Sequence, residues 1–206
     1  KFTTAHQAVD AMLAQNDVAS SSYYLKGLIY YTEGKDKEAL DYVNKALRYN
    51  GGNAQALALG GDILRRNGSY SQAIGPYEKI VRAKRADERV LLSLAECYCR
   101  VNNYKLLEQV TSLLREQGQD KEALQKIELR ALIQQKRMEE AEQLLKQMSG
   151  VKEDSEFLVL RALCELAAGR RAAATEMIQK AIDLDPKNRE AIELRHVLSK
   201  EMEIRK

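Results

Sequence analysis

The chain has 206 residues, of which 45% are hydrophobic and 31% charged, and its formal net charge is +3. A chain of this length can bury a sizeable core as one large domain or two small ones. Its 2 prolines and 11 glycines are too few for a low-complexity or collagen-like protein, and no apolar run is long enough to cross a membrane. The excess of positive charge is small and diffuse, so it does not predict a nucleic-acid partner.

The N-terminal residues, Lys1-Phe2-Thr3-Thr4, include neither an initiator methionine nor the apolar stretch of a signal peptide. We therefore expect the chain to be part of a longer protein. Three cysteines are an odd number, which argues against a disulfide framework. Because reduced thiols are typical of the cytosol, the sequence predicts a cytoplasmic location.

An internal repeat of 33 or 34 residues runs along the chain. Its first marker, mostly a small residue, recurs at Gly27, Gly61, Ala95, Leu129 and Ala162. A second marker lies twelve residues after each, at Ala39, Ala73, Leu107, Ala141 and Ala174. Turn signals stand between the two markers, at Gly34, Gly68, Asn102-Asn103, Lys136 and Gly169. Each unit therefore predicts a helix, a short turn and a second helix.

The sizes of the recurring residues indicate how these helices pack. Small residues let the two helices of a unit approach closely, and the bulky residues that follow them fill the groove against the next unit. One helical hairpin cannot bury its apolar face alone, so successive units must stack. The sequence therefore predicts an all-α protein of stacked, antiparallel helix pairs.

This pattern resembles the tetratricopeptide repeat (TPR) family. In the first repeat, the residues that match the family are Tyr23, Gly27, Tyr30, Gly34, Ala39 and Ala46. In the last repeat, they are Leu158, Ala162, Gly169, Ala174, Ala181 and Asp185-Pro186. The resemblance implies a right-handed α-solenoid, the TPR superhelix.

In chain order, the resemblance implies one continuous solenoid domain with a half-repeat first and a capping helix last. Its parts are the second helix of a truncated repeat at 1–19, five repeats at 20–53, 54–87, 88–121, 122–154 and 155–188, and the cap at 189–206. The repeat at 88–121 diverges, because Leu107 stands where a small residue is expected. The repeat at 122–154 diverges most and is one residue short. Inside the second helix of the 54–87 repeat, Gly75-Pro76 predicts a kink near residues 72–76, either a tolerated bend or a hinge.

The sequence holds no constellation of catalytic or metal-ligating residues. Gly34-Lys35 lacks the remaining residues of a phosphate-binding loop, and the two histidines, His6 and His196, lie near opposite ends of the predicted array. Cys97 and Cys99 have no partner pair at zinc spacing, so we expect Cys97 to fill the core and Cys99 to lie on the concave face. We predict a protein that is not an enzyme and uses no cofactor or metal.

The resemblance implies a binding groove, because the first helix of each TPR lines the concave surface of the array. Carried over by repeat position, the partner-binding residues are Tyr24, Leu28, Tyr31, Asp62, Arg65, Arg66, Arg89, Leu92, Glu96, Cys99, Arg100, Lys126, Arg130, Ile133, Val159, Leu163 and Leu166. Aromatic and apolar residues begin this lining, basic residues follow, and apolar residues end it. Such a lining suits an extended or helical partner segment with apolar and acidic side chains. Alternatively, the apolar members pack against adjacent helices and the arginines are solvated.

The function that these features favour is a non-catalytic scaffold or adaptor that binds a protein or peptide segment. One alternative is RNA binding, which the basic cluster of Arg82, Lys84, Arg85 and Arg89 suggests. Another is the regulatory region of an enzyme whose catalytic domain lies outside this chain. The N-terminal half-repeat also has an apolar face, formed by Phe2, Val9, Met12 and Leu13, through which two copies would pair as a homodimer.

Overall fold

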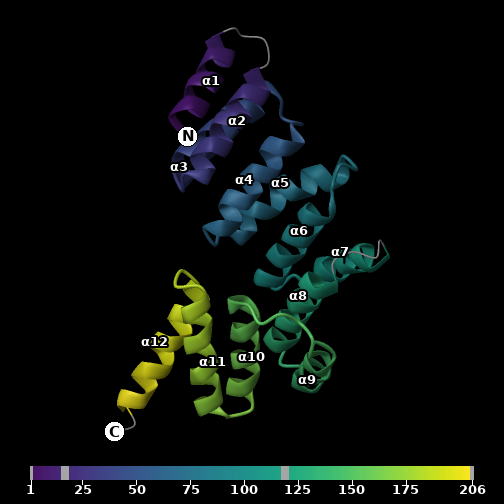
Figure 1. Cartoon of the computed structure of the whole chain (residues 1–206). Coiled ribbons are helices and arrows are strands. Elements are labelled where there is room, and N and C mark those ends of the chain that lie inside the picture. The colour runs from purple at the N-terminus through teal and green to yellow at the C-terminus, as the bar shows by residue number, and fades with distance from the viewer. Residues whose placement is uncertain (1, 15–18, 117–120, 205–206) are drawn as a thin grey trace. The chain divides into compact units, whose positions relative to one another are not determined.

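The computed structural model describes residues 2–14, 19–116 and 121–204, and no side chain beyond residue 200. Within these ranges the regular structure is entirely α-helical, as predicted (Figure 1). The helices are α1 (Phe2–Ala14), α2 (Ala19–Thr32), α3 (Asp36–Tyr49), α4 (Ala54–Arg66), α5 (Tyr70–Arg82), α6 (Glu88–Arg100), α7 (Tyr104–Glu116), α8 (Lys121–Gln134), α9 (Met138–Gln147), α10 (Ser155–Ala167), α11 (Arg171–Leu184) and α12 (Arg189–Ile204).

The helices form two compact units, one of residues 1–119 and one of residues 120–206. Unit 1 contains α1 to α7, and unit 2 contains α8 to α12. Within each unit, every helix packs against the next helix of the chain. In addition, α2 packs on α4 and α4 on α6, while α8 packs on α10 and α10 on α12. First helices of successive repeats are therefore neighbours within each unit, and the continuity of the whole solenoid stays a prediction.

The predicted turns lie at residues whose backbone adopts the left-handed conformation, with positive φ. The angle φ is +77° at Gly34, +76° at Gly68, +59° at Asn102, +60° at Lys136 and +77° at Gly169. At the first of these turns, the Lys35 amide donates to the carbonyl of Tyr30 at 2.9 Å, and the Gly34 amide donates to that of Tyr31 at 3.1 Å. These bonds satisfy carbonyl groups that would otherwise have no donor at the helix end. The five turn signals are thus confirmed.

Small residues allow close packing within the helix pairs. Ala39, Ala73, Ala141 and Ala174 are completely buried. A Cβ atom added at Gly61 would lie 2.6 Å from the ring of Tyr77, which is itself completely buried. The position occupied by Leu107 is buried as well, so this diverged repeat accommodates a larger side chain inside the protein.

Polar residues connect the helix pairs at regular positions. Asn53 caps α4 by accepting from the amide of Ala56 at 3.0 Å, and its side-chain amide donates to Ser20 at 2.9 Å. Ser20 in turn donates to the carbonyl of Ala46 at 3.0 Å. The same network recurs in unit 2, where Ser155 donates to Ala181 at 2.7 Å and accepts from Asn188 at 2.7 Å.

The N-terminal helix α1 packs against α2 through a mixture of apolar and polar contacts. Val9 is buried, whereas Phe2 and Met12 are about half exposed. His6 lies 4.7 Å from the ring of Tyr30, and Lys26 of α2 forms an ion pair with Asp10. Part of the apolar face that we predicted for this segment is therefore covered by α2, and the homodimer stays a prediction.

The helix that contains Pro76 is not interrupted at the proline. The helix α5 runs from Tyr70 to Arg82 with Pro76 inside it, so the proline does not end the helix. The predicted kink at residues 72–76 stays a prediction. The C-terminal helix α12 packs on α11 and α10 and buries Ala191 and Leu198.

Candidate functional site: the first-helix faces

The predicted groove residues lie on the first helices of the repeats, and each unit presents its own set. In unit 1 they lie on α2, α4 and α6, and in unit 2 on α8 and α10. We call these two sets the first-helix face of unit 1 and the first-helix face of unit 2.

The α2 part of the unit 1 face is aromatic and apolar. Tyr24, Leu28 and Tyr31 are half-buried and pack against a core cluster that includes Val43 and Ile63. Each therefore packs inward and keeps part of its surface in solvent, and partner binding by these residues stays a prediction. The only charged residue of α2 is Lys26, which is buried.

Arg66 of α4 extends this aromatic surface. Its guanidinium carbon lies 3.8 Å from the centroid of the Tyr31 ring, a cation–π contact. It also donates from Nε to Asp36 at 3.1 Å and from Nη2 to the carbonyl of Tyr31 at 3.4 Å. The charge of Arg66 is thus balanced by a carboxylate of α3, while its stacked guanidinium remains partly exposed.

Two further ion pairs join α4 to α6. Arg65 donates to Glu96 at 2.7 Å, and Arg89 donates to Asp62 at 2.6 Å. Asp62 also accepts from the hydroxyl of Tyr77 at 2.7 Å. Burial alone would lower the pKa of Arg65, but Glu96 and Tyr77 outweigh burial and raise this pKa. The arginines that we expected to meet an acidic partner are therefore paired within the protein.

Cys99 does not lie on a surface, in contrast to our expectation. Cys99 is completely buried, and most other residues of α6 are buried as well, because this helix packs against α4, α5 and α7. Cys97 is buried as predicted, and burial raises the pKa of its thiol to about 12. Of the remaining α6 residues, Leu92 is half-buried, and Arg100 lies 5.3 Å from the Tyr70 ring.

In unit 2, two predicted surface cations prove to be buried. Arg130 donates to Glu190 of α12 at 2.6 Å and lies 3.5 Å from Glu156 of α10. Lys126 contacts Asp154 at 2.6 Å and Glu122 at 2.9 Å. Burial by itself would lower the pKa of Lys126, but the two carboxylates raise it. Both cations are therefore paired, Arg130 with carboxylates of α10 and α12, and Lys126 with Glu122 of its own helix and with Asp154, the cap of α10.

The apolar members of the unit 2 face contribute mainly to the core. Val159 is completely buried in a cluster with Leu158, Ala181 and Ala191, which corrects its assignment to the groove. Ile133, Leu163 and Leu166 are half-buried against the core clusters of this unit. We conclude that the unit 2 face offers less apolar surface than its sequence suggests.

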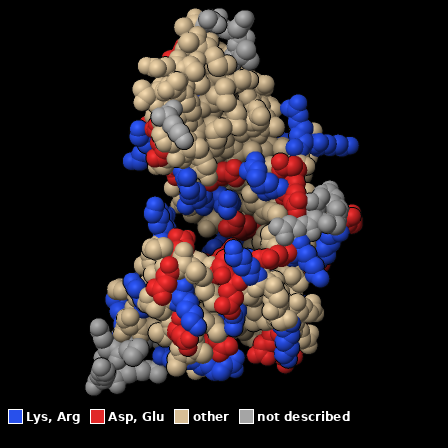
Figure 2. All heavy atoms as spheres, viewed as in Figure 1, with Lys and Arg blue, Asp and Glu red and all other residues tan. Residues whose placement is uncertain are grey.

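Charged side chains are unevenly distributed over the visible face of the molecule. Figure 2 shows few of them over the helices α1 to α4, and many over the other helices. Among the described residues there is no cluster of three or more His, Cys, Asp or Glu that would hold a metal ion. None of the described helices combines the length and the hydropathy of a membrane span.

The sequence pattern did not single out several residues that pair with the groove cations or cap the helices. The carboxylates Asp36, Asp154, Glu156 and Glu190 neutralise the groove cations. Each lies at or next to the start of a helix. The caps Asn53, Asp87, Asp154 and Asn188 are 34, 67 and 34 residues apart, which is one or two repeat lengths. The sequence shows this period, and it would have located them.

Comparison with known families identifies the repeat. A tetratricopeptide repeat model matches residues 20–53 and 155–188, and a second model of the same description matches residues 38–88. Together these matches span half of the chain. The chain belongs to the tetratricopeptide repeat family.

Solved TPR structures share this fold. A TPR protein from Parabacteroides merdae superposes with a TM-score of 0.73 at 18% identity, covering 96% of this chain and 78% of its own. YrrB, described as a TPR protein with an unusual peptide-binding site, gives 0.62 at 18% identity, covering 92% and 98%. The Cut9–Hcn1 hetero-tetramer of the APC/C gives 0.71 at 13% identity, covering 99% of this chain and 40% of the other. A search of curated protein sequences found no match.

Proposed function

We propose that this TPR protein is a non-catalytic scaffold that binds a largely uncharged segment of a partner protein on the first-helix face of unit 1. The TPR fold is in general a scaffold for protein interactions. The observation that carries the finer proposal is the surface formed by Tyr24, Leu28, Tyr31 and the stacked Arg66. Exposed tyrosine and arginine are the residue types that most often anchor interfaces.

The ion pairs of the unit 1 face support a partner segment with few charged side chains. Because Arg65 and Arg89 already contact Glu96 and Asp62, a ligand carboxylate would have to displace a carboxylate of the protein. Apolar and aromatic side chains would meet no such competition on α2. The peptide-binding site attributed to YrrB supports a peptide-like ligand as well, although likeness at 18% identity shows the fold alone.

Peptide selection tests this proposal. Random peptides displayed on phage would be selected against the protein, and the dissociation constants of the best binders measured by calorimetry. We expect selected peptides rich in apolar and aromatic residues, and we expect Tyr24→Ala/Tyr31→Ala to weaken them by about tenfold or more. The matched control is Tyr49→Ala, since Tyr49 is an aromatic residue that is 63% exposed and lies on the second helix α3.

Comparison with this control shows which result would contradict the proposal. Equal losses in the double variant and in Tyr49→Ala would remove the unit 1 face from recognition. Circular dichroism of each variant would confirm that the helices persist, so that a loss of binding reports the surface rather than the fold.

A further inference from the structure

Two turns of unit 1 contain the dipeptide Asn-Gly. Asn50-Gly51 follows α3, Asn67-Gly68 follows α4, and the sequence contains no third copy. All four residues are exposed. Asparagine is a chemically labile residue, and it is most labile before glycine, because glycine has no side chain to shield the backbone nitrogen that attacks it. The chain thus holds the same reactive dipeptide in two backbone environments.

The reaction of this dipeptide begins at the backbone nitrogen of the glycine. This nitrogen attacks the side-chain carbonyl carbon of the asparagine, the bond from that carbon to the side-chain nitrogen breaks, and ammonia leaves with the proton that the backbone nitrogen gives up. Water then opens the resulting succinimide at either of its carbonyl groups, which yields aspartate or isoaspartate. An amide that is held in a hydrogen bond must first leave this bond, so its reaction is slower.

The two glycine amides differ in their hydrogen bonds. The Gly68 amide donates to the carbonyl of Arg65 at 2.9 Å, within the turn in which Gly68 has a φ of +76°. The Gly51 amide donates to no residue that the structure describes. A Cβ atom added at Gly51 would lie 3.6 Å from the Leu47 carbonyl, an ordinary contact distance, so this turn is not crowded. The nitrogen of Gly51 is therefore the more available nucleophile.

The side chain of Asn50 is also oriented for the reaction. Its Oδ1 accepts from the Gly52 amide at 3.0 Å, an Asx turn that folds the side chain back over the residues that follow it. A donor on this oxygen stabilises the negative charge that the oxygen carries after attack on the carbonyl carbon. Among the described residues, no corresponding hydrogen bond holds the side chain of Asn67.

We propose that Asn50 is a deamidation site of this protein, whereas the fold protects Asn67. Aspartate at position 50 keeps the length of the backbone and an acceptor for Gly52. Isoaspartate instead adds one methylene to the main chain between α3 and Asn53. The Asn53 amide donates to the Asn50 carbonyl at 3.1 Å, and the Asn53 side chain caps α4. Isoaspartate therefore disturbs the junction between the first two repeats, independently of partner binding to the unit 1 face.

Rates of deamidation in the folded and unfolded chain test this proposal. The full chain would be incubated at physiological temperature and slightly alkaline pH. It would then be cleaved with trypsin, because cleavage after Arg48 and Arg66 places the two asparagines on separate peptides for mass spectrometry. We expect Asn50 to react about two- to tenfold faster than Asn67, the ratio that corresponds to the net free energy of one backbone hydrogen bond.

The unfolded chain is the control for the dipeptide itself. In concentrated guanidinium chloride neither turn persists, so the two asparagines should react at similar rates. A rate at Asn67 that equals or exceeds the rate at Asn50 in the folded protein would overturn the proposal. A preference for Asn50 that persists in the denaturant would overturn it as well, because the fold would then not be its cause.

The variant Asn50→Gln tests the structural consequence, because glutamine forms the corresponding larger ring much more slowly. Incubated wild-type protein should contain isoaspartate, recognised by its resistance to an aspartate-specific protease, and should unfold at a lower denaturant concentration than fresh protein. Incubated Asn50→Gln should unfold like its own fresh sample. The matched control is Asn44→Gln, at an exposed position within α3, which should lose stability as the wild type does. Equal losses in Asn50→Gln and Asn44→Gln would contradict an effect of isoaspartate on the junction.

Discussion

Gly61 of α4 shows how a single hydrogen atom determines the packing of a helix pair. A Cβ atom there would lie 2.6 Å from Tyr77 Cζ and 2.7 Å from Cε1. The Tyr77 ring cannot move aside easily, because it is completely buried and its hydroxyl is held by Asp62. Burial and the bond to Asp62 also raise the pKa of this hydroxyl, so it remains a neutral donor.

We therefore expect Gly61→Ala to destabilise the protein by about 1–3 kcal/mol, the usual cost of overpacking a core. The gain in helix propensity from glycine to alanine, about 1 kcal/mol, offsets only part of this cost. The control is Gly51→Ala in an exposed turn, where the added atom would lie 3.6 Å from the Leu47 carbonyl and the effect should stay near zero. Urea unfolding followed by circular dichroism measures both, and equal stability of the two variants would contradict the packing argument.

At the scale of elements, the repeats at 20–53 and 155–188 contain the same serine–asparagine network. Each network connects the start of a first helix to the carbonyl end of the second helix and caps the helix that follows the repeat. It satisfies a serine, an asparagine and a helix carbonyl at one junction, where partly buried groups without partners would be costly. Polar contacts thus hold successive helices together, in addition to the apolar core.

We expect Asn53→Ala to cost about 1–2 kcal/mol, because it removes the cap of α4 and the donor to Ser20 together. The matched control is Asn44→Ala, an exposed position within α3, which should be neutral or slightly stabilising because alanine favours helix. Chemical denaturation distinguishes the two variants. A loss at Asn53 no larger than that at Asn44 would show that the network contributes nothing measurable.

At the scale of the whole molecule, two of the cations that suggested a polyanion partner form ion pairs within the protein. Arg82 and Arg89, which suggested an RNA-binding cluster, pair with Glu78 and Asp62. Phosphate binding depends on cations that are free to displace counterions. The internal pairs and the net charge of +3 therefore disfavour a nucleic-acid partner.

We accordingly expect no saturable binding of fluorescent poly(U) in anisotropy titrations at about 0.15 M salt. Weak binding at low salt that disappears as salt is added would fit non-specific attraction alone. Binding that persists at about 0.15 M and is reduced by Lys84→Ala/Arg85→Ala would instead favour the RNA alternative over the scaffold.

Local sequence patterns determine the helix pairs of this protein, and long-range packing determines the surface of its first helices. The repeat period, the turns at Gly34, Gly68 and Gly169, and the buried small residues follow from the sequence, because helical periodicity and left-handed φ angles restrict residue types locally. The repeat pattern also placed candidate binding residues on first helices, but it could not show which of them remain exposed.

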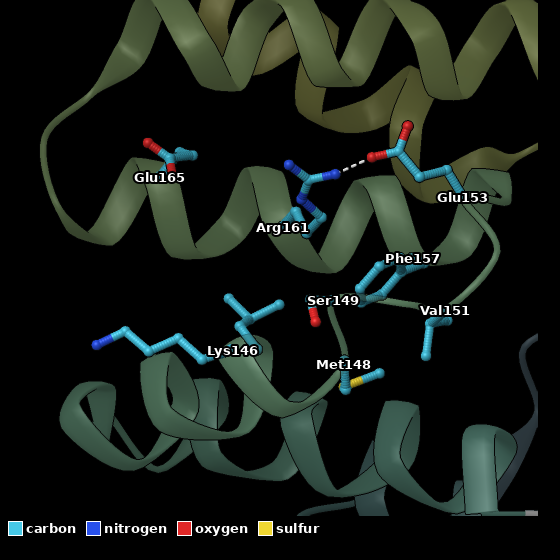
Figure 3. A pocket seen from close by; sticks show the side chains of 9 residues that line it. Lys146, Met148, Ser149, Val151, Glu153, Phe157, Arg161 and Glu165 are labelled. Carbon is cyan, nitrogen blue, oxygen red and sulfur yellow. Dashed lines mark hydrogen bonds and ion pairs between the residues drawn. The ribbon is translucent and has the colours of Figure 1, made fainter.

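Only the tertiary structure showed that Cys99 and Val159 are buried and that Arg130 contacts a carboxylate 60 residues away. Such outcomes depend on which helices surround a position and which charges reach it from other repeats, and no local pattern encodes either. A cavity of unit 2 that Phe157, Arg161 and Glu165 line (Figure 3) likewise depends on how α10 lies against α9, which no local pattern shows. The sequence by itself determined the repeat and its helix pairs, whereas long-range packing decided which side chains a partner can reach.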